Sequence, residues 1–289
     1  MEAGIFIPIT SDYGFKATFG NETDTLFLRV ALQALIKSDV AIRDVLFDKN
    51  AFEALTAESR SGIFDLACTD ESGTHFIVEM QLGYVPNFVQ RMKFYGLHKF
   101  NTLIEKGQHD YANLPKIYII ALLERNILST PGYHTIANLR SETGEIVDSQ
   151  MTFITVELAK FDLPLSDIQT NLEKLIYTMK TLDKTPFADY PDFWDEEWLR
   201  RAIDELNTRS MTSEERFQFA RITAKNAEAI WAEKRKIEAA KEAENLAVKT
   251  ETVKTALQMG LTVEQIAKVA NVSIEFVETI RQEHSATDE

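Results

Sequence analysis

The sequence predicts a mixed α/β fold followed by a helical extension, and three observations carry this prediction. Residues 61–82 contain two strand-like runs around the turn Asp70-Glu71-Ser72-Gly73, a pattern typical of a β-hairpin. An amphipathic stretch at 87–106 precedes the apolar run 116–123, which indicates a helix followed by a buried strand. Residues 213–258 contain neither Gly nor Pro and are rich in Ala, Glu and Lys, as long helices are.

Further elements complete the predicted order αβββαβ. A helix is expected over residues 24–37, with Asn21 or Thr23 as its N-cap. A strand is expected at 42–47, immediately before the hairpin. After the strand at 116–123, the pattern predicts strands near 133–139 and 151–158 and a helix near 167–182.

Length and composition are those of a protein with a sizeable core. The 289 residues suffice for one large domain with an appendage, and 45% of them are hydrophobic. No run approaches the roughly 20 apolar residues of a membrane span, and the N-terminus does not resemble a secretory signal. The single cysteine, Cys68, excludes an internal disulfide, and the five histidines lack zinc-ligand spacing. We therefore expect a cytoplasmic, bacterial-type intracellular protein with no membrane partner.

Each strand of the predicted hairpin carries an acid in an otherwise apolar run. Because side chains alternate between the faces of a strand, Glu79 and Gln81 share one face, and Asp65 can join them from the neighbouring strand. A carboxylate in a half-buried strand is costly unless a cation or hydrogen bonds stabilise it. Two adjacent carboxylates on a rigid sheet suit a hard divalent cation. The alternative is that the acids protect a sheet edge from further pairing.

These residues resemble a known family. Asp65, followed after a turn by Glu79-Met80-Gln81, resembles the PD-(D/E)XK nuclease signature, in particular the recombination-promoting nucleases or putative transposases, in which Gln replaces the usual Lys. The D…ExQ core is a weak signal by itself, whereas four blocks in order are more specific. The other blocks are residues 11–20, Arg91 to Tyr95 with its Arg-x-x-x-Tyr spacing, and 107–123, and the resemblance spans roughly residues 8–235.

The resemblance implies a restriction-endonuclease-like αβββαβ core with a mixed central sheet. It also implies a metal-dependent DNA endonuclease that hydrolyses phosphodiester bonds and is associated with recombination or mobile elements. Asp65, Glu79 and the backbone carbonyl of Met80 would hold Mg²⁺, with Mn²⁺ or Ca²⁺ as alternatives, and Gln81 would position the attacking water. The catalytic residues would then be Asp65, Glu79 and Gln81. Glu22 either adds a carboxylate or caps a helix.

Gln81 cannot supply the positive charge of the usual Lys, so stabilisation of the transition state there is either weaker or comes from another cation. The candidates are Lys16, Arg60, Arg91 and Lys93.

The net charge of −14 opposes nucleic-acid binding, but the charge is unevenly distributed. Residues 189–215 are strongly acidic, whereas the helix expected at 87–106 is basic. Arg91, Tyr95, His98 and Thr102 fall on one face of that helix, which either meets a phosphate backbone or is simply solvated. The expected DNA-binding residues are Lys16, Arg60, Arg91, Lys93 and Tyr95.

We expect three parts in the chain: a nuclease-like domain at 1–210, a helical arm at 211–259 and a small helix-turn-helix-like module at 260–289. The arm has a poor heptad pattern, which favours a solvated helix, although homodimerisation through it stays open. The second helix of the module carries Glu275, Glu278 and Glu283. This acidity favours packing or protein interaction over base reading.

Two alternatives to an active nuclease follow. One is a catalytically weak or inactive nuclease-fold protein that acts as a DNA- or protein-binding module. The other is a regulator that acts through its C-terminal helices. The presence of both Asp65 and Glu79 favours the enzyme.

Overall fold

The computed structural model describes residues 6–48, 65–83, 87–103, 114–208 and 211–285. The helices and strands follow the predicted αβββαβ order, preceded by one short helix. These elements are α1 (Asp12–Thr18), α2 (Leu26–Leu35), β1 (Val45–Phe47), β2 (Leu66–Asp70), β3 (His75–Gln81), α3 (Phe88–Thr102) and β4 (Ile117–Leu123). They are followed by β5 (His134–Arg140), β6 (Ile146–Glu157), α4 (Asn171–Thr181), α5 (Glu197–Glu205), α6 (Ser213–Gln258), α7 (Val263–Ala270) and α8 (Ile274–Ser285). Short 3-10 turns lie at Leu158–Lys160, Leu165–Asp167, Phe187–Asp189 and Asp192–Asp195.

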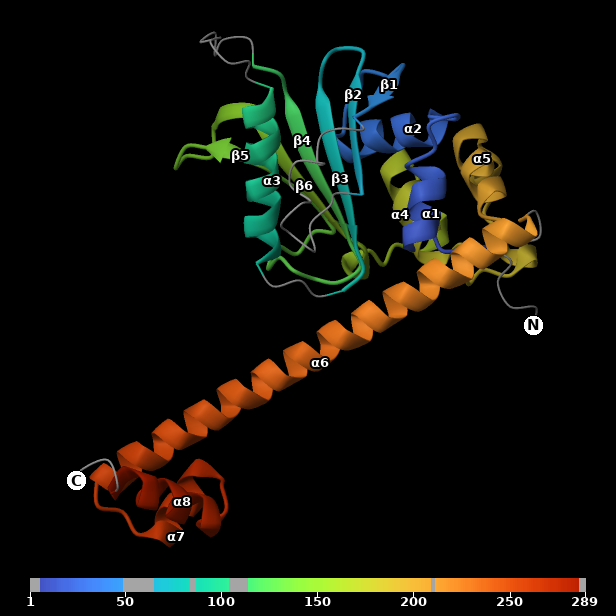
Figure 1. Cartoon of the computed structure of the whole chain (residues 1–289). Helices are drawn as coiled ribbons and strands as arrows, with labels where there is room; N and C mark the ends of the chain where they lie inside the picture. Colours follow the sequence, from blue (N-terminus) through green and yellow to red (C-terminus); the bar gives the residue numbers. More distant parts are fainter. Residues whose placement is uncertain (1–5, 49–64, 84–86, 104–113, 209–210, 286–289) are drawn as a thin grey trace. The chain divides into compact units, whose positions relative to one another are not determined.

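The strands form one mixed sheet in the order β1-β2-β3-β4-β6-β5 (Figure 1). The pairs β1–β2, β2–β3 and β5–β6 are antiparallel. The pairs β3–β4 and β4–β6 are parallel, and α3 makes the crossover between β3 and β4. The predicted mixed central sheet with flanking helices is therefore confirmed.

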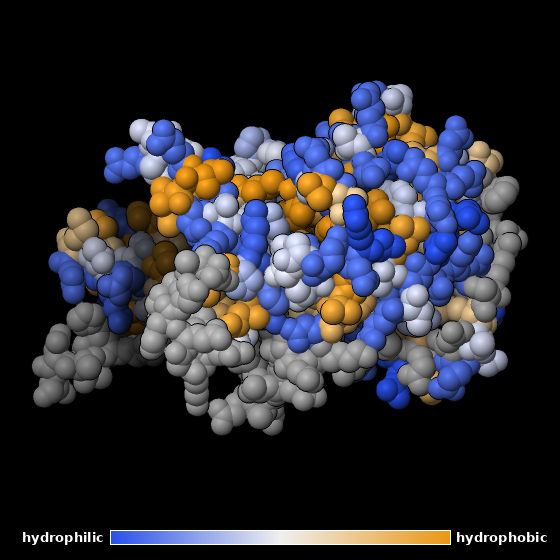
Figure 2. Space-filling view, turned by 90° about the horizontal axis from the view of Figure 1, so that it is seen from above, coloured by the Kyte–Doolittle hydropathy of each residue, from blue (hydrophilic) through white to orange (hydrophobic). Residues whose placement is uncertain are grey.

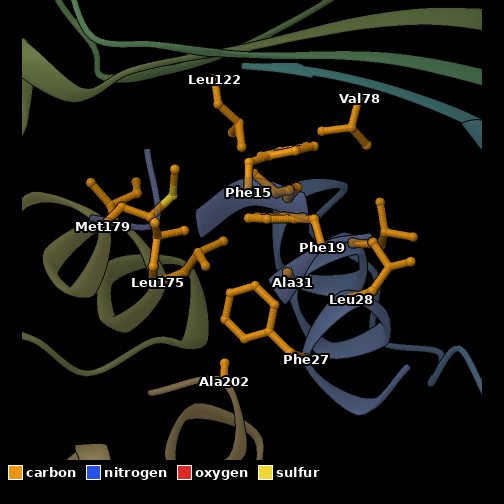
Figure 3. Close-up of a cluster of buried hydrophobic side chains, with 14 of the residues drawn as sticks. Phe15, Phe19, Phe27, Leu28, Ala31, Val78, Leu122, Leu175, Met179 and Ala202 are labelled. Atoms are coloured by element: carbon orange, nitrogen blue, oxygen red, sulfur yellow. The ribbon is translucent and has the colours of Figure 1, made fainter. Parts of the chain in front are cut away.

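Helices cover both faces of the sheet, so the strands are apolar on both sides. One face packs against α1, α2, α4 and α5, and Figure 3 shows Phe15 of α1 lying against Val78 and Leu122 of the sheet. The other face packs against α3, where Phe88 and Met92 meet Ile77 and the neighbouring strands. The strand pattern predicted this alternation, which places Val78 in one core and Ile77 in the other.

The short helix α1 is an element that the sequence pattern did not predict. Ser11 caps it, because its Oγ accepts a hydrogen bond from the Gly14 main-chain N–H at 3.0 Å. Gly14 lies so close to the preceding chain that an added Cβ would be 2.0 Å from the carbonyl oxygen of Pro8. Glycine at this position therefore lets α1 dock against the chain that leads into it.

Several predicted boundaries were wrong: β6 begins at Ile146 and not near residue 151, and other differences have a local reason. The predicted N-caps Asn21 and Thr23 do not cap α2: the Asn21 side chain accepts the N–H groups of Thr23 and Asp24 in a turn, and Thr25 is the N-cap. The strand expected from residue 42 begins at Val45. The main-chain N–H groups of the two residues before it are bound by the Glu71 carboxylate instead of by a strand.

The helix expected from residue 167 begins at Asn171, because Thr170 and Glu173 form a capping box there. The acidic segment also contains a helix that was not expected, α5. Its apolar face, which includes Trp198 and Leu199, is buried against the core, while its acids remain outside.

The chain divides into two compact units at Thr223 and Ala224, within α6. In the second unit, the last turns of α6 pack with α7 and α8 around a small core. Val277 and Ile280, the predicted apolar face of α8, are buried in it, and Thr262 caps α7 as expected. Within the described residues, none of the helices combines the length and the apolar character needed to cross a membrane.

Hydrophobic and hydrophilic residues are interspersed on the face seen in Figure 2. Large apolar side chains are exposed on β5 and β6, including Leu139, Ile146 and Val147.

Candidate active site

The strand register brings Asp65 beside Glu79. Leu66, the first residue of β2, pairs with Val78 of β3 in antiparallel register. The next residues outward are Asp65 and Glu79, and directly opposed antiparallel residues face the same side of a sheet. The Met80 main-chain N–H donates a 2.7 Å hydrogen bond to Oδ2 of Asp65, so the Asp65 carboxylate lies at the β3 backbone.

The Met80 carbonyl also points toward Asp65. In a strand, the N–H and C=O of one residue point to the same neighbouring strand, and successive residues alternate. The Gln81 carbonyl accepts a hydrogen bond from the Glu124 N–H, on the β4 side of β3. Met80 therefore turns its carbonyl to the opposite side, where its N–H already bonds Asp65.

Glu79 is buried, with 7% of its surface exposed, and meets a cation from α3. Nη2 of Arg91 donates to Oε1 of Glu79 in a charge-assisted hydrogen bond. The same nitrogen donates to Oε1 of Gln81 at 3.0 Å. Among the described atoms, the second Glu79 oxygen, Oε2, and Nε of Arg91 are buried without hydrogen-bond partners. A buried oxygen of a charged group without a partner is costly, which suits a position that another ligand fills.

Arg91 is held over two aromatic rings of its own helix. Its guanidinium carbon lies 5.6 Å from the centre of the Phe88 ring and 5.9 Å from that of Tyr95. These residues are three positions before and four after Arg91, so all three share the helix face that packs on the sheet. The Tyr95 side chain is correspondingly buried.

The Asp65 carboxyl group titrates well above its ordinary range. Burial raises its pKa from 3.8 to about 6, and this desolvation outweighs the Met80 N–H bond, which lowers the pKa. Three charged side chains also act on it: Asp12 raises the pKa, while Lys16 and Arg91 lower it. Asp12 and Lys16 form an ion pair on α1 at 3.0 Å.

Asp12 was not among the expected site residues. The resemblance marked the block 11–20, but an acid at the start of a short helix is usually read as a capping charge. Glu22, the acid considered instead, is exposed in the turn before α2 and is not among the charges that shift the Asp65 pKa.

The structure gathers only some of the other expected residues. Lys93 is exposed, and it lies two positions after Arg91, hence on a different face of α3. Lys99, one of the basic residues of that helix, is buried in an ion pair with Asp48. Arg60 lies outside the described residues.

The donor set fits a hard divalent ion. Two carboxylates and a main-chain carbonyl are oxygen ligands, and Mg²⁺ is commonly bound by one or two carboxylates together with water and phosphate oxygens. In the part of the chain that the structure describes, there is no group of three or more His, Cys, Asp or Glu side chains that could hold a metal. A site here would therefore have two protein carboxylates and leave positions for substrate.

One of the comparisons with known proteins identifies a family. A family model described as PD-(D/E)XK nuclease family transposase matches residues 9–240, which include the sheet, Asp65, Glu79 and Arg91. No curated protein and no solved structure matches the chain. PD-(D/E)XK nucleases generally use divalent metals, and the family implies a DNA substrate. The match covers most of the chain, which therefore belongs to the PD-(D/E)XK nuclease family of transposases.

Proposed function

We propose that this protein is a Mg²⁺-dependent DNA endonuclease whose centre is formed by Asp65, Glu79 and the Met80 carbonyl. The observation that carries the proposal is the buried Glu79 carboxylate, which has one oxygen without a partner and directly precedes Met80, whose main-chain N–H bonds the Asp65 carboxylate. The family's transposase description supports an association with recombination or mobile elements.

The chain contributes ligands and orientation. The chemistry that a divalent ion supplies when bound is polarisation of the phosphodiester and a lower pKa for the attacking water. Protonation of Asp65 would weaken metal binding at acidic pH, because a pKa of about 6 leaves the carboxyl group mostly protonated below that pH. The amide oxygen of Gln81 accepts a hydrogen bond from Arg91. Its amide N–H₂ group is a donor, which would orient a water or a phosphate oxygen.

Arg91 supplies the positive charge that Gln81 cannot. A guanidinium suits phosphate oxygens, because its donors form a planar fork. Arg91 lies at the carboxylates, whereas Lys93 is on another helix face. Lys16, which acts on the Asp65 carboxyl from α1, adds a second positive charge near the centre.

The test is cleavage of supercoiled plasmid DNA with Mg²⁺, Mn²⁺ or Ca²⁺, and with EDTA. A closed circle has no ends, so its conversion to nicked circles reports endonuclease activity directly. We expect metal-dependent nicking that is lost in Asp65→Ala and Glu79→Ala and kept in Glu145→Ala, a control at an exposed carboxylate between β5 and β6. Nicking that is unchanged in both site variants would place the activity elsewhere.

A second candidate is a binding protein on a nuclease fold. The ion pair between Arg91 and Glu79 favours it, because the pair already neutralises one of the two proposed metal ligands. The absence of cleavage with all three metals, together with a gel shift of the same DNA, would support this alternative.

A further inference from the structure

We propose that the guanidinium of Arg91 is the counter-ion of Glu79 in the free protein and opposes cation binding there. A phosphate of the nucleic acid would bind the guanidinium in place of Glu79, so that the divalent cation and the nucleic acid bind cooperatively. This inference rests on the proposed function and concerns how that site is regulated.

The first support is the incomplete pairing of Arg91 with Glu79. Arginine and carboxylate groups commonly form two parallel hydrogen bonds, which satisfy both partners. Here one nitrogen, Nη2, donates to both Glu79 and Gln81. Nε of Arg91 and Oε2 of Glu79 remain buried without partners among the described atoms. A purely structural pair would gain by satisfying these atoms, so the arrangement suits one that exchanges partners.

The second support is electrostatic competition. Glu79 is a proposed cation ligand, and it already faces the guanidinium of Arg91. A divalent cation placed at the same carboxylate would be repelled by that guanidinium, which lowers its affinity for the free protein. A phosphate that accepts hydrogen bonds from Arg91 would remove the competition and add negative charge.

The third support is the position of the side chain. The Arg91 side chain is 26% exposed although its Nε is buried, so part of this side chain is accessible from the surface. Phe88 and Tyr95 place their rings under it from both sides along α3. The attraction between a cation and an aromatic ring depends on their separation, so the two rings would still hold the guanidinium when it donates to a phosphate in place of the carboxylate.

Calorimetric titration of the full chain with Ca²⁺, with and without a short DNA duplex, tests the proposal. For the wild type we expect the duplex to tighten Ca²⁺ binding about tenfold, within the usual range of coupling between sites. Arg91→Met should bind Ca²⁺ about tenfold tighter than the wild type without duplex and should lose most of the coupling. The control Arg140→Met, at an exposed arginine on β5, should behave as the wild type. Ca²⁺ affinity that is unchanged or weaker in Arg91→Met would overturn the proposal.

Two further readouts separate the possible failures. If Arg91→Met does not fold, as judged by circular dichroism, then Arg91→Gln decides, because it removes the charge but keeps a polar side chain at this position. Tightening of Ca²⁺ binding supports the proposal, and wild-type affinity contradicts it. If Ca²⁺ binds with the expected coupling but the plasmid is not cleaved, the counter-ion role of Arg91 is supported and the proposed endonuclease activity is overturned. The absence of Ca²⁺ binding in every variant, with and without duplex, would overturn both.

Discussion

The main-chain N–H of Met80 donates a hydrogen bond to the Asp65 carboxylate at 2.7 Å. This bond extends the contact between the two hairpin strands beyond the Leu66–Val78 pair. It holds Asp65 at the point where β3 presents Glu79 and the Met80 carbonyl. The bond lowers the pKa of Asp65, yet burial prevails and the net pKa is about 6.

Asp65→Asn should stabilise the metal-free protein at neutral pH. The ordinary pKa is 3.8 and the folded value is about 6, so the folded state binds the proton more tightly than the unfolded state. The contribution of protonated Asp65 to the free energy of unfolding is therefore complete below about pH 4, falls as the pH rises and is lost above about pH 6. Asn keeps an oxygen for the Met80 N–H and avoids the buried charge. We expect a gain of about 1–3 kcal/mol at pH 7 and little difference at pH 4.

Thermal denaturation in EDTA at these two pH values measures this effect. Glu145→Gln, at an exposed carboxylate, is the matched control and should show no such pH dependence. An Asp65→Asn protein that is less stable than the wild type at pH 7 but not at pH 4 would mean that ionised Asp65 stabilises the fold, and would contradict this prediction.

Gln81→Lys should weaken the metal-free fold rather than restore a stronger nuclease. Oε1 of Gln81 accepts from Arg91 at 3.0 Å, so an ammonium group there would face a guanidinium. The lost hydrogen bond and the like charges should together cost on the order of 1 kcal/mol. Gln81→Glu should instead raise the stability of the metal-free fold, because it adds a negative partner for Arg91. Melting temperatures in EDTA compare the two variants, and a Gln81→Lys protein that nicks plasmid faster than the wild type would contradict the role given to Arg91.

Gly14→Ala should displace α1 and destabilise the protein strongly. The added Cβ would meet the backbone of Pro8 at 2.0 Å, and backbone cannot turn aside as a flexible side chain can. We expect a loss of about 1–3 kcal/mol, typical of overpacking, measured by urea unfolding. Gly132→Ala is the control, since the nearest atom to its Cβ would be 3.7 Å away. Equal stability of the two variants would show that α1 docks loosely.

Local patterns were enough to predict the hairpin and its two acids. Period-2 alternation fixes which residues share a face, and the turn at Gly73 fixes which strands meet. The order of helices and strands followed from the same reasoning, because long periodic segments such as α3 and β4 carry strong local signals.

The charged surroundings of Asp65 and Glu79 depend on docking, which local patterns do not encode. The periodicity of α3 placed Arg91 and Tyr95 on one face, and the two alternatives considered for that face were a phosphate backbone and solvent. The structure turns it to the sheet and buries Tyr95. Asp12 acts on Asp65 only because α1 docks through Gly14 and Phe15. A seven-residue helix is too short to show the periodicity that would have predicted it.

The most direct test of the central claim is a crystal structure with Mn²⁺ and a short DNA duplex, using the anomalous signal of the metal. We expect a peak within bonding distance of Asp65, Glu79 and the Met80 carbonyl, with Arg91 turned from Glu79 to a phosphate. A peak elsewhere, or Arg91 still paired with Glu79 at saturating Mn²⁺ and DNA, would contradict it.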